Sequence, residues 1–175
     1  MTKAQIIQSI AGRLGVPAQW LDGLIAFESN YDPLAVAKMP YNAEAIAHGE
    51  PARYAKGLIQ FIDPTAAWLG FIDSQDLIDK NPTFESQMEN AVYPYLQKMS
   101  PFISEQDFYM AVFYPAYRRT DPGKPFPDPV IAVNPGITTP RDYINHVNRA
   151  VATRRIIPLA AGGAAALVAA FIFLR

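Results

Sequence analysis

Glu28 is the residue of this sequence whose position best suits acid–base chemistry. It lies near the end of a stretch with helical periodicity, residues 17–29, whose apolar stripe is formed by Trp20, Leu21, Leu24 and Ile25. Helical spacing places Glu28 on the same stripe. A carboxyl group that faces apolar neighbours at a helix C-terminus is desolvated and meets the negative end of the helix dipole, and both effects raise its pKa. The stripe therefore predicts a proton donor near neutral pH, and the alternative is a glutamate that simply reaches solvent.

The composition argues against several other kinds of site. The 175 residues include no cysteine, which excludes disulfides and thiolate catalysis. His48 and His146 are far apart and have no carboxylate or cysteine at ligand spacing, so we expect neither a metal nor another cofactor. Residues 1–142 carry 11 basic and 16 acidic side chains, whereas residues 143–175 carry four arginines and no acid. This asymmetry argues against nucleic-acid binding and places basic charge beside an apolar C-terminus.

The periodicity and the helix start signals predict a mainly α domain over residues 1–150. We expect helices over residues 3–14, 17–29, 63–70, 81–99 and 104–117, and another from Thr139 onwards. Pro94 should kink the helix that contains it. Residues 30–56 and 115–140 are expected to be irregular, and seven prolines should make the second stretch rigid. We interpret these two stretches as the walls of a groove.

Three segments resemble, in the same order, the motifs of the soluble lytic transglycosylases, a family of lysozyme-like enzymes that cleave peptidoglycan. Residues 28–35, ESNYDPLA, are similar to the motif that contains the family's catalytic glutamate. Residues 57–70, GLIQFIDPTAAWLG, are similar to the second motif, and residues 110–117, MAVFYPAY, align more loosely with the third. The resemblance covers roughly residues 10–120 and implies a lysozyme-like fold in which Glu28 is the catalytic acid and base.

The resemblance also implies four substrate-binding residues, which are Ser29, Gly57, Gln60 and Tyr114. A glycine at position 57 lets the backbone approach a sugar closely. Gln60 offers a donor and an acceptor, which suit an N-acetyl group or the orientation of Glu28; the alternative is a loop amide that bonds to nearby backbone. Tyr114 either places a hydroxyl near the carboxyl group or packs as a core aromatic residue.

The sequence departs from the family pattern at three places. Pro115 stands where the family has asparagine, Tyr117 stands where it has glycine, and the segment 38–56 is longer than the usual spacer. The family's substrate contacts near Tyr114 and in the spacer therefore do not carry over. Three basic residues nearby either line the groove or are solvated charges, and these are Arg118, Arg119 and Lys124.

The resemblance implies cleavage of the β-1,4 bond between N-acetylmuramic acid and N-acetylglucosamine in peptidoglycan glycan strands. A lytic transglycosylase needs a single carboxyl group, whereas most glycosidases use two, and no second acid lies in a matching motif. Three alternatives stay open. One is a lysozyme-type muramidase that uses water. Another is a non-catalytic peptidoglycan-binding or membrane structural protein on a degenerate lysozyme fold, and the third is a membrane assembly factor.

The C-terminal residues have the composition of a membrane anchor. Residues 156–174 contain no charged side chain, and their length suits a helix that crosses a bilayer. Arg154 and Arg155 make residues 151–155 a basic juxtamembrane segment. A buried core helix is the alternative for the apolar run. We therefore expect a single-pass membrane protein whose partners are the lipid bilayer and peptidoglycan.

The N-terminal residues show no recognisable secretory signal, although peptidoglycan lies outside the cytoplasmic membrane. A wall-cutting motif combined with a C-terminal anchor predicts an enzyme that another particle carries to the wall. We therefore expect a protein of a lipid-containing phage virion, where other virion membrane proteins are further partners, that opens the host wall during genome delivery. The bacterial cytoplasmic membrane is the alternative location.

Overall fold

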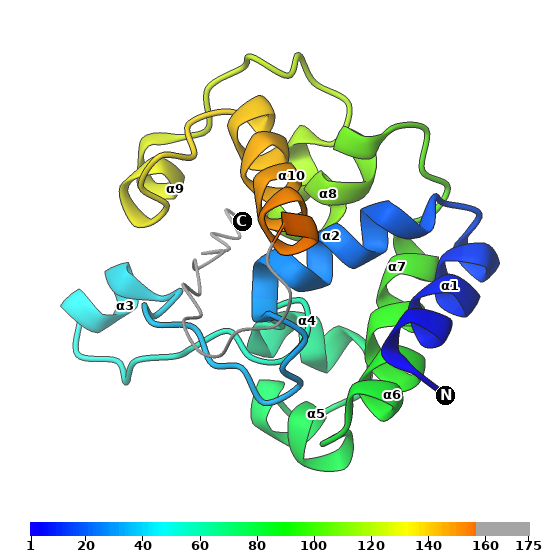
Figure 1. Ribbon diagram of the computed structural model, residues 1–175. Coiled ribbons are helices and arrows are strands. Elements are labelled where there is room, and N and C mark those ends of the chain that lie inside the picture. Colours follow the sequence, from blue (N-terminus) through cyan, green and yellow to red (C-terminus); the bar gives the residue numbers. More distant parts are fainter. Residues whose placement is uncertain (157–175) are drawn as a thin grey trace.

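The computed structural model of the chain describes residues 1–156, with the side chains of residues 1–152, and this part is mainly α (Figure 1). Residues 1–156 contain no β-strand, and β-pairing is limited to the isolated bridges Val36–Lys56 and Lys56–Phe61. The helices are α1 (Lys3–Leu14), α2 (Ala18–Ser29), α3 (Ala43–Ala47), α4 (Asp63–Trp68), α5 (Ser74–Lys80), α6 (Phe84–Gln87), α7 (Tyr93–Met99), α8 (Glu105–Phe113), α9 (Asp128–Val133) and α10 (Pro140–Ile156), with a π-helical turn η1 (Met88–Val92) and a 3₁₀ turn η2 (Pro115–Tyr117).

The first two predicted helices are confirmed, and each has a clear local cause. Thr2 begins α1 with a capping box, because its hydroxyl accepts from the Gln5 backbone N–H and the Gln5 side chain accepts from the Thr2 N–H. Gly15 ends α1 in the left-handed conformation. Asn30 ends α2 in the same way, with φ of 55°. The chain therefore turns sharply two residues after Glu28.

Helix α10 lies across α2 at the centre of the molecule (Figure 1) and contacts it more extensively than it contacts α8. Gly23 allows this close approach. A Cβ atom at position 23 would lie 3.0 Å from Val147 Cγ1 and 3.1 Å from the Tyr109 hydroxyl oxygen. Because these distances are tighter than ordinary van der Waals contact, the side-chain-free face of Gly23 fixes how closely the two helices pack.

Several predicted boundaries are wrong, and proline explains one of them. The helix expected over 104–117 ends at Phe113, because Pro115 has no backbone N–H and restricts the residue before it. The helix expected over 81–99 begins at Phe84, after the capping box formed by Thr83 and Ser86. Its continuity is then broken by η1, in which the Tyr93 N–H reaches the Met88 carbonyl directly before Pro94. A widened turn thus stands directly before Pro94, where the kink is predicted.

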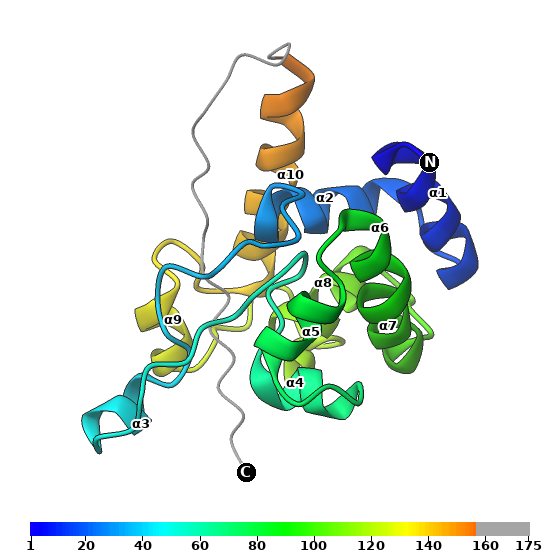
Figure 2. The same ribbon diagram turned by 90° about the horizontal axis from the view of Figure 1, so that it is seen from below.

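The two stretches expected to be irregular contain short helices, which corrects the prediction. Residues 30–56 include α3, and residues 115–140 include α9, whose start follows Pro127 and includes Pro129. Helix α5 was not expected and begins with an N-cap, since the Asp73 side chain accepts from the Asp76 N–H. Helices α3 and α9 lie on the side of the molecule opposite α1 (Figures 1 and 2). The groove between the two stretches stays a prediction.

The C-terminal part of the domain is one continuous helix. Helix α10 begins at Pro140, as expected from Thr139, and continues through the predicted juxtamembrane segment 151–155 to Ile156. Within residues 1–156, no helix is both long and apolar enough to cross a bilayer. The predicted membrane-spanning segment lies outside the described residues apart from Ile156.

We predict that Gly23→Ala destabilises the fold, because the new methyl group forces α10 away from α2. Overpacking of this kind costs about 1–3 kcal/mol, measured as the free energy of unfolding in urea. Gly12→Ala is the matched control, since Gly12 is exposed within α1 and nothing lies within 4 Å of its would-be Cβ. The control should stabilise the fold by roughly 0.5–1 kcal/mol through helix propensity alone. Equal effects of the two substitutions would contradict the packing argument.

Candidate active site

Glu28 lies in the last turn of α2 and is buried where α2 packs against α10, with 1% of its surface exposed. The Tyr143 hydroxyl of α10 donates a hydrogen bond to Glu28 Oε1. Burial raises the pKa of Glu28 from 4.5 to about 8, and the hydrogen bond from Tyr143 offsets part of that rise. Glu28 Oε2 is also buried and has no hydrogen-bond partner among the described residues. The side chain is therefore a carboxylic acid near neutral pH with one oxygen left for another group.

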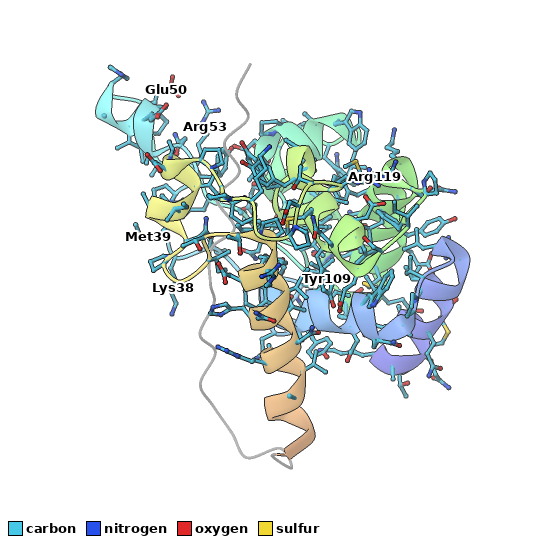
Figure 3. All side chains as sticks on the ribbon, turned by 90° about the horizontal axis from the view of Figure 1, so that it is seen from above. Lys38, Met39, Glu50, Arg53, Tyr109 and Arg119 are labelled. Atoms are coloured by element: carbon cyan, nitrogen blue, oxygen red, sulfur yellow. The ribbon has the colours of Figure 1, made fainter. Side chains whose placement is uncertain are left out.

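Aromatic rings hold Tyr143 against the carboxyl group. Its ring centroid lies 4.5 Å from that of Phe113 on α8, 5.1 Å from that of Phe27 on α2 and 6.2 Å from that of Tyr109. Tyr109 lies near the middle of the molecule, where α2, α8 and α10 meet (Figure 3). Burial raises the pKa of Tyr143 well above its ordinary value, and the neighbouring Glu28 raises it further. The hydroxyl thus stays protonated and acts as a donor to Glu28.

The contact between Tyr143 and Glu28 bears on the two interpretations of Tyr114, whose role in substrate binding stays a prediction. The hydroxyl that reaches the carboxyl group comes from Tyr143, whereas the Tyr114 ring packs 5.1 Å from Tyr117 and 5.9 Å from Phe126. Tyr114 is 8% exposed, which matches the alternative of a core aromatic residue. Ser29 is also internal, since its hydroxyl donates to the Ile25 carbonyl one turn earlier in α2.

Gly57 has a structural role inside the protein. Its φ is +81°, and a Cβ atom there would lie 2.4 Å from Gln87 Oε1. The position therefore requires glycine both for its backbone conformation and for the Gln87 side chain. The predicted approach of a sugar to this glycine stays a prediction.

Gln60 adopts the bonding that the sequence left as the alternative. Its side chain is 2% exposed, its φ is 55°, and its Nε2 donates to the Gly57 carbonyl at 2.9 Å. Gln60 also lines a small hollow, together with Ile59, Phe61, Thr65, Tyr95 and Val112. The hollow is thus formed by the loop that carries the second motif and by the helices packed beneath it.

The basic residues after Pro115 do not form a free cationic wall. Arg118 Nε lies 2.6 Å from Asp107 Oδ1, and an Arg119 nitrogen lies 3.3 Å from Asp107 Oδ2. Asp107 is fully buried, so the two arginines neutralise an internal carboxylate. Lys124 lies over the Tyr117 ring, 4.9 Å from its centroid. Tyr117, which replaces the family's glycine, thus has a packing role.

Two residues of the site were missed from the sequence. Tyr143 and Val147 are four residues apart on one face of α10, a pattern that indicates a core-facing stripe but does not say which helix it meets. Gln87 is fully buried and bonds to the first two motif segments, at Pro33 and at Leu58. A lone glutamine inside the helix predicted over 81–99 gives no such signal.

Comparison with known protein families, with curated proteins and with solved structures finds no match to this chain. The resemblance to lytic transglycosylases therefore depends on the motif residues.

We predict that the free energy of unfolding falls as the pH rises from about 4.5 to about 8. The unfolded chain ionises Glu28 near its ordinary pKa of 4.5, whereas the folded chain holds the proton up to about pH 8. The contribution of protonated Glu28 to the free energy of unfolding is thus complete below pH 4.5. It is lost between pH 4.5 and about 8, at no more than about 1.4 kcal/mol per pH unit.

Urea titrations at pH 5, 6, 7 and 8 would measure this slope. Glu28→Gln should flatten it, while Glu85→Gln, at an exposed position of α6, should leave it unchanged. A slope that persists in Glu28→Gln would show that another group is responsible.

Proposed function

We propose that this protein is a peptidoglycan lytic transglycosylase with a lysozyme-like fold, and that Glu28 is its catalytic acid and base. The observation that carries the proposal is the buried carboxyl group of Glu28, which has a raised pKa, a fixed donor on Oε1 and an unpartnered Oε2. The order of the three motif segments supports the same function.

The arrangement around Glu28 suits a reaction with one carboxyl group. Oε2, as the protonated oxygen, would donate its proton to the glycosidic oxygen that leaves C1 of N-acetylmuramic acid. Glu28 would then be a carboxylate, and the hydrogen bond from Tyr143 stabilises that form. The carboxylate would take the proton from the 6-hydroxyl of the same sugar as that oxygen attacks C1. The products are a 1,6-anhydro sugar and a free hydroxyl group on the released strand.

Water plays no part in this reaction, and the burial of Glu28 is consistent with that. A site closed to solvent favours attack by the sugar's own hydroxyl over hydrolysis. The same burial means that a bound glycan strand has to uncover Oε2, since Glu28 is 1% exposed. Gln60 lines the small hollow beside the second motif, and its contact with a sugar stays a prediction.

The place of action that we propose rests on the apolar composition of residues 156–174 and on the direction of α10. The C-terminal end of α10 projects from the body of the protein, on the side away from α3 (Figure 2). A membrane anchor that continued from α10 would leave the rest of the domain, with α3 and α9, facing away from the bilayer. We infer that the protein belongs to the membrane of a lipid-containing phage virion and opens the host wall during genome delivery.

We predict that Glu28→Gln lowers the rate at which fragments are released from purified peptidoglycan by about 100-fold or more, while the variant stays folded. Mass spectrometry of the products made by the unaltered protein would show 1,6-anhydro ends. Reducing ends would instead indicate a hydrolase. Glu85→Gln serves as the matched control and should retain full activity. The absence of cleavage by the unaltered protein would refute the proposed function.

We predict that Tyr143→Phe shifts the pH dependence of cleavage. Cleavage requires protonated Glu28, so kcat/KM should decline as the pH rises through about 8. Removing the Tyr143 hydroxyl takes away a hydrogen bond that lowers the pKa of Glu28, so the decline should move to a pH higher by roughly 0.5–1 unit. Phenylalanine preserves the ring contacts with Phe27 and Phe113. A profile that is unchanged or shifted to lower pH would contradict this role.

A further inference from the structure

Gln87 lies at the end of α6, and its side chain is fully buried. Its Oε1 accepts from the Leu58 backbone N–H at 2.5 Å. Its Nε2 donates to the Pro33 carbonyl at 2.9 Å and to the Asn81 carbonyl at 3.2 Å. One amide group therefore bonds to the backbone of three segments that are distant from one another in the sequence.

Two of these segments carry the motif residues. Pro33 follows Glu28 by five residues, and Leu58 follows Gly57 in the loop that includes Gln60. The two segments also bond directly, since the Gly57 N–H donates to the Ala35 carbonyl at 2.8 Å. The Gln87 side chain packs against this junction, because its oxygen occupies the space that a side chain at position 57 would fill.

The fold holds Gln87 in place from both sides. The capping box of Thr83 and Ser86 begins α6, and Ser86 directly precedes Gln87. The π-helical turn η1 begins at Met88, directly after it. Inserted turns of this kind change the direction of nearby side chains and are frequent at functional sites. All hydrogen-bonding groups of the amide have partners, so the side chain has one preferred orientation.

We infer that Gln87 is a positioning residue of the proposed reaction, which sets the place of the Gly57–Gln60 loop relative to the segment that begins with Glu28. This inference depends on the proposed function. Gln87 does not contact Glu28 in this arrangement, since its bonds go to the backbone of Leu58, Pro33 and Asn81. It therefore acts on glycan binding through the loop and leaves the protonation of Glu28 unchanged.

The test compares Gln87→Met with Gln87→Glu and with the control Asn90→Ala. Methionine has nearly the same length but offers no hydrogen bond to any of the three segments. Glutamate keeps an acceptor for the Leu58 N–H, but as a carboxylate it has no donor for the Pro33 and Asn81 carbonyls. Asn90 lies in the adjoining turn η1, is exposed and bonds to the Asn81 side chain, so its removal disturbs the neighbourhood of Gln87 without touching either motif segment.

For cleavage of soluble peptidoglycan fragments well below the melting temperature of each variant, we expect Gln87→Met to raise KM at least 10-fold. The pH at which kcat/KM declines should stay that of the unaltered protein, and kcat should change less than 3-fold. Gln87→Glu should raise KM at least as much, because its carboxylate faces the Pro33 and Asn81 carbonyls without a donor. A shifted pH profile, or an equal loss in Asn90→Ala, would overturn the inference.

Amide hydrogen exchange tests the same inference without activity. The Leu58 amide should exchange at least 10-fold faster in Gln87→Met than in Asn90→Ala, while amides of α2 change equally in both. If the unaltered protein cleaves nothing, the proposed function fails while the exchange result still decides whether Gln87 fixes the loop. If cleavage occurs but Leu58 exchanges at the same rate in both variants, the inference about Gln87 fails alone.

Discussion

The packing of α10 across α2 is the contact on which the rest of the site depends. Gly23 sets the separation of the two helices, and Tyr143 approaches Glu28 only because that separation is small. The same contact removes the carboxyl group from water and so raises its pKa. One steric feature of α2 thus leads to the burial, the hydrogen bond and the protonation state of the candidate catalytic residue.

The turn after α2 connects this acid to the second half of the site. Asn30 and Tyr31 both have positive φ, which is uncommon for residues other than glycine. The Tyr31 hydroxyl donates to Asp22 at 2.7 Å, and the Asp32 side chain accepts from the Leu34 N–H at 2.9 Å. These bonds hold a reversal of the chain that leads directly to the carbonyl of Pro33, where Gln87 bonds. The acid and the Gly57–Gln60 loop are therefore connected through backbone that has little freedom.

The sequence was sufficient for features with local causes. The mainly α character and the first two helices follow from periodicity, and the start of α10 follows from the start signal at Thr139. The burial of Glu28 also followed from its place on the stripe of α2. Pairing between distant segments could not be predicted in this way, because a single sequence does not tell which helix the Tyr143 face meets. Helices α3, α5 and α9 are too short for periodicity to be informative.

Most of the motif residues have structural roles, and this bears on what the resemblance can support. Gly57 accommodates Gln87, Gln60 bonds to its own loop, and Ser29 bonds within α2. A protein that used the fold alone would keep these residues. It would have no use for a buried carboxyl group with an unpartnered oxygen, because such a group lowers stability above its unfolded-state pKa. A glutamine or an apolar residue at position 28 would remove that loss. The presence of Glu28 in this environment is therefore the strongest argument that the protein is an enzyme and not a structural relative of one.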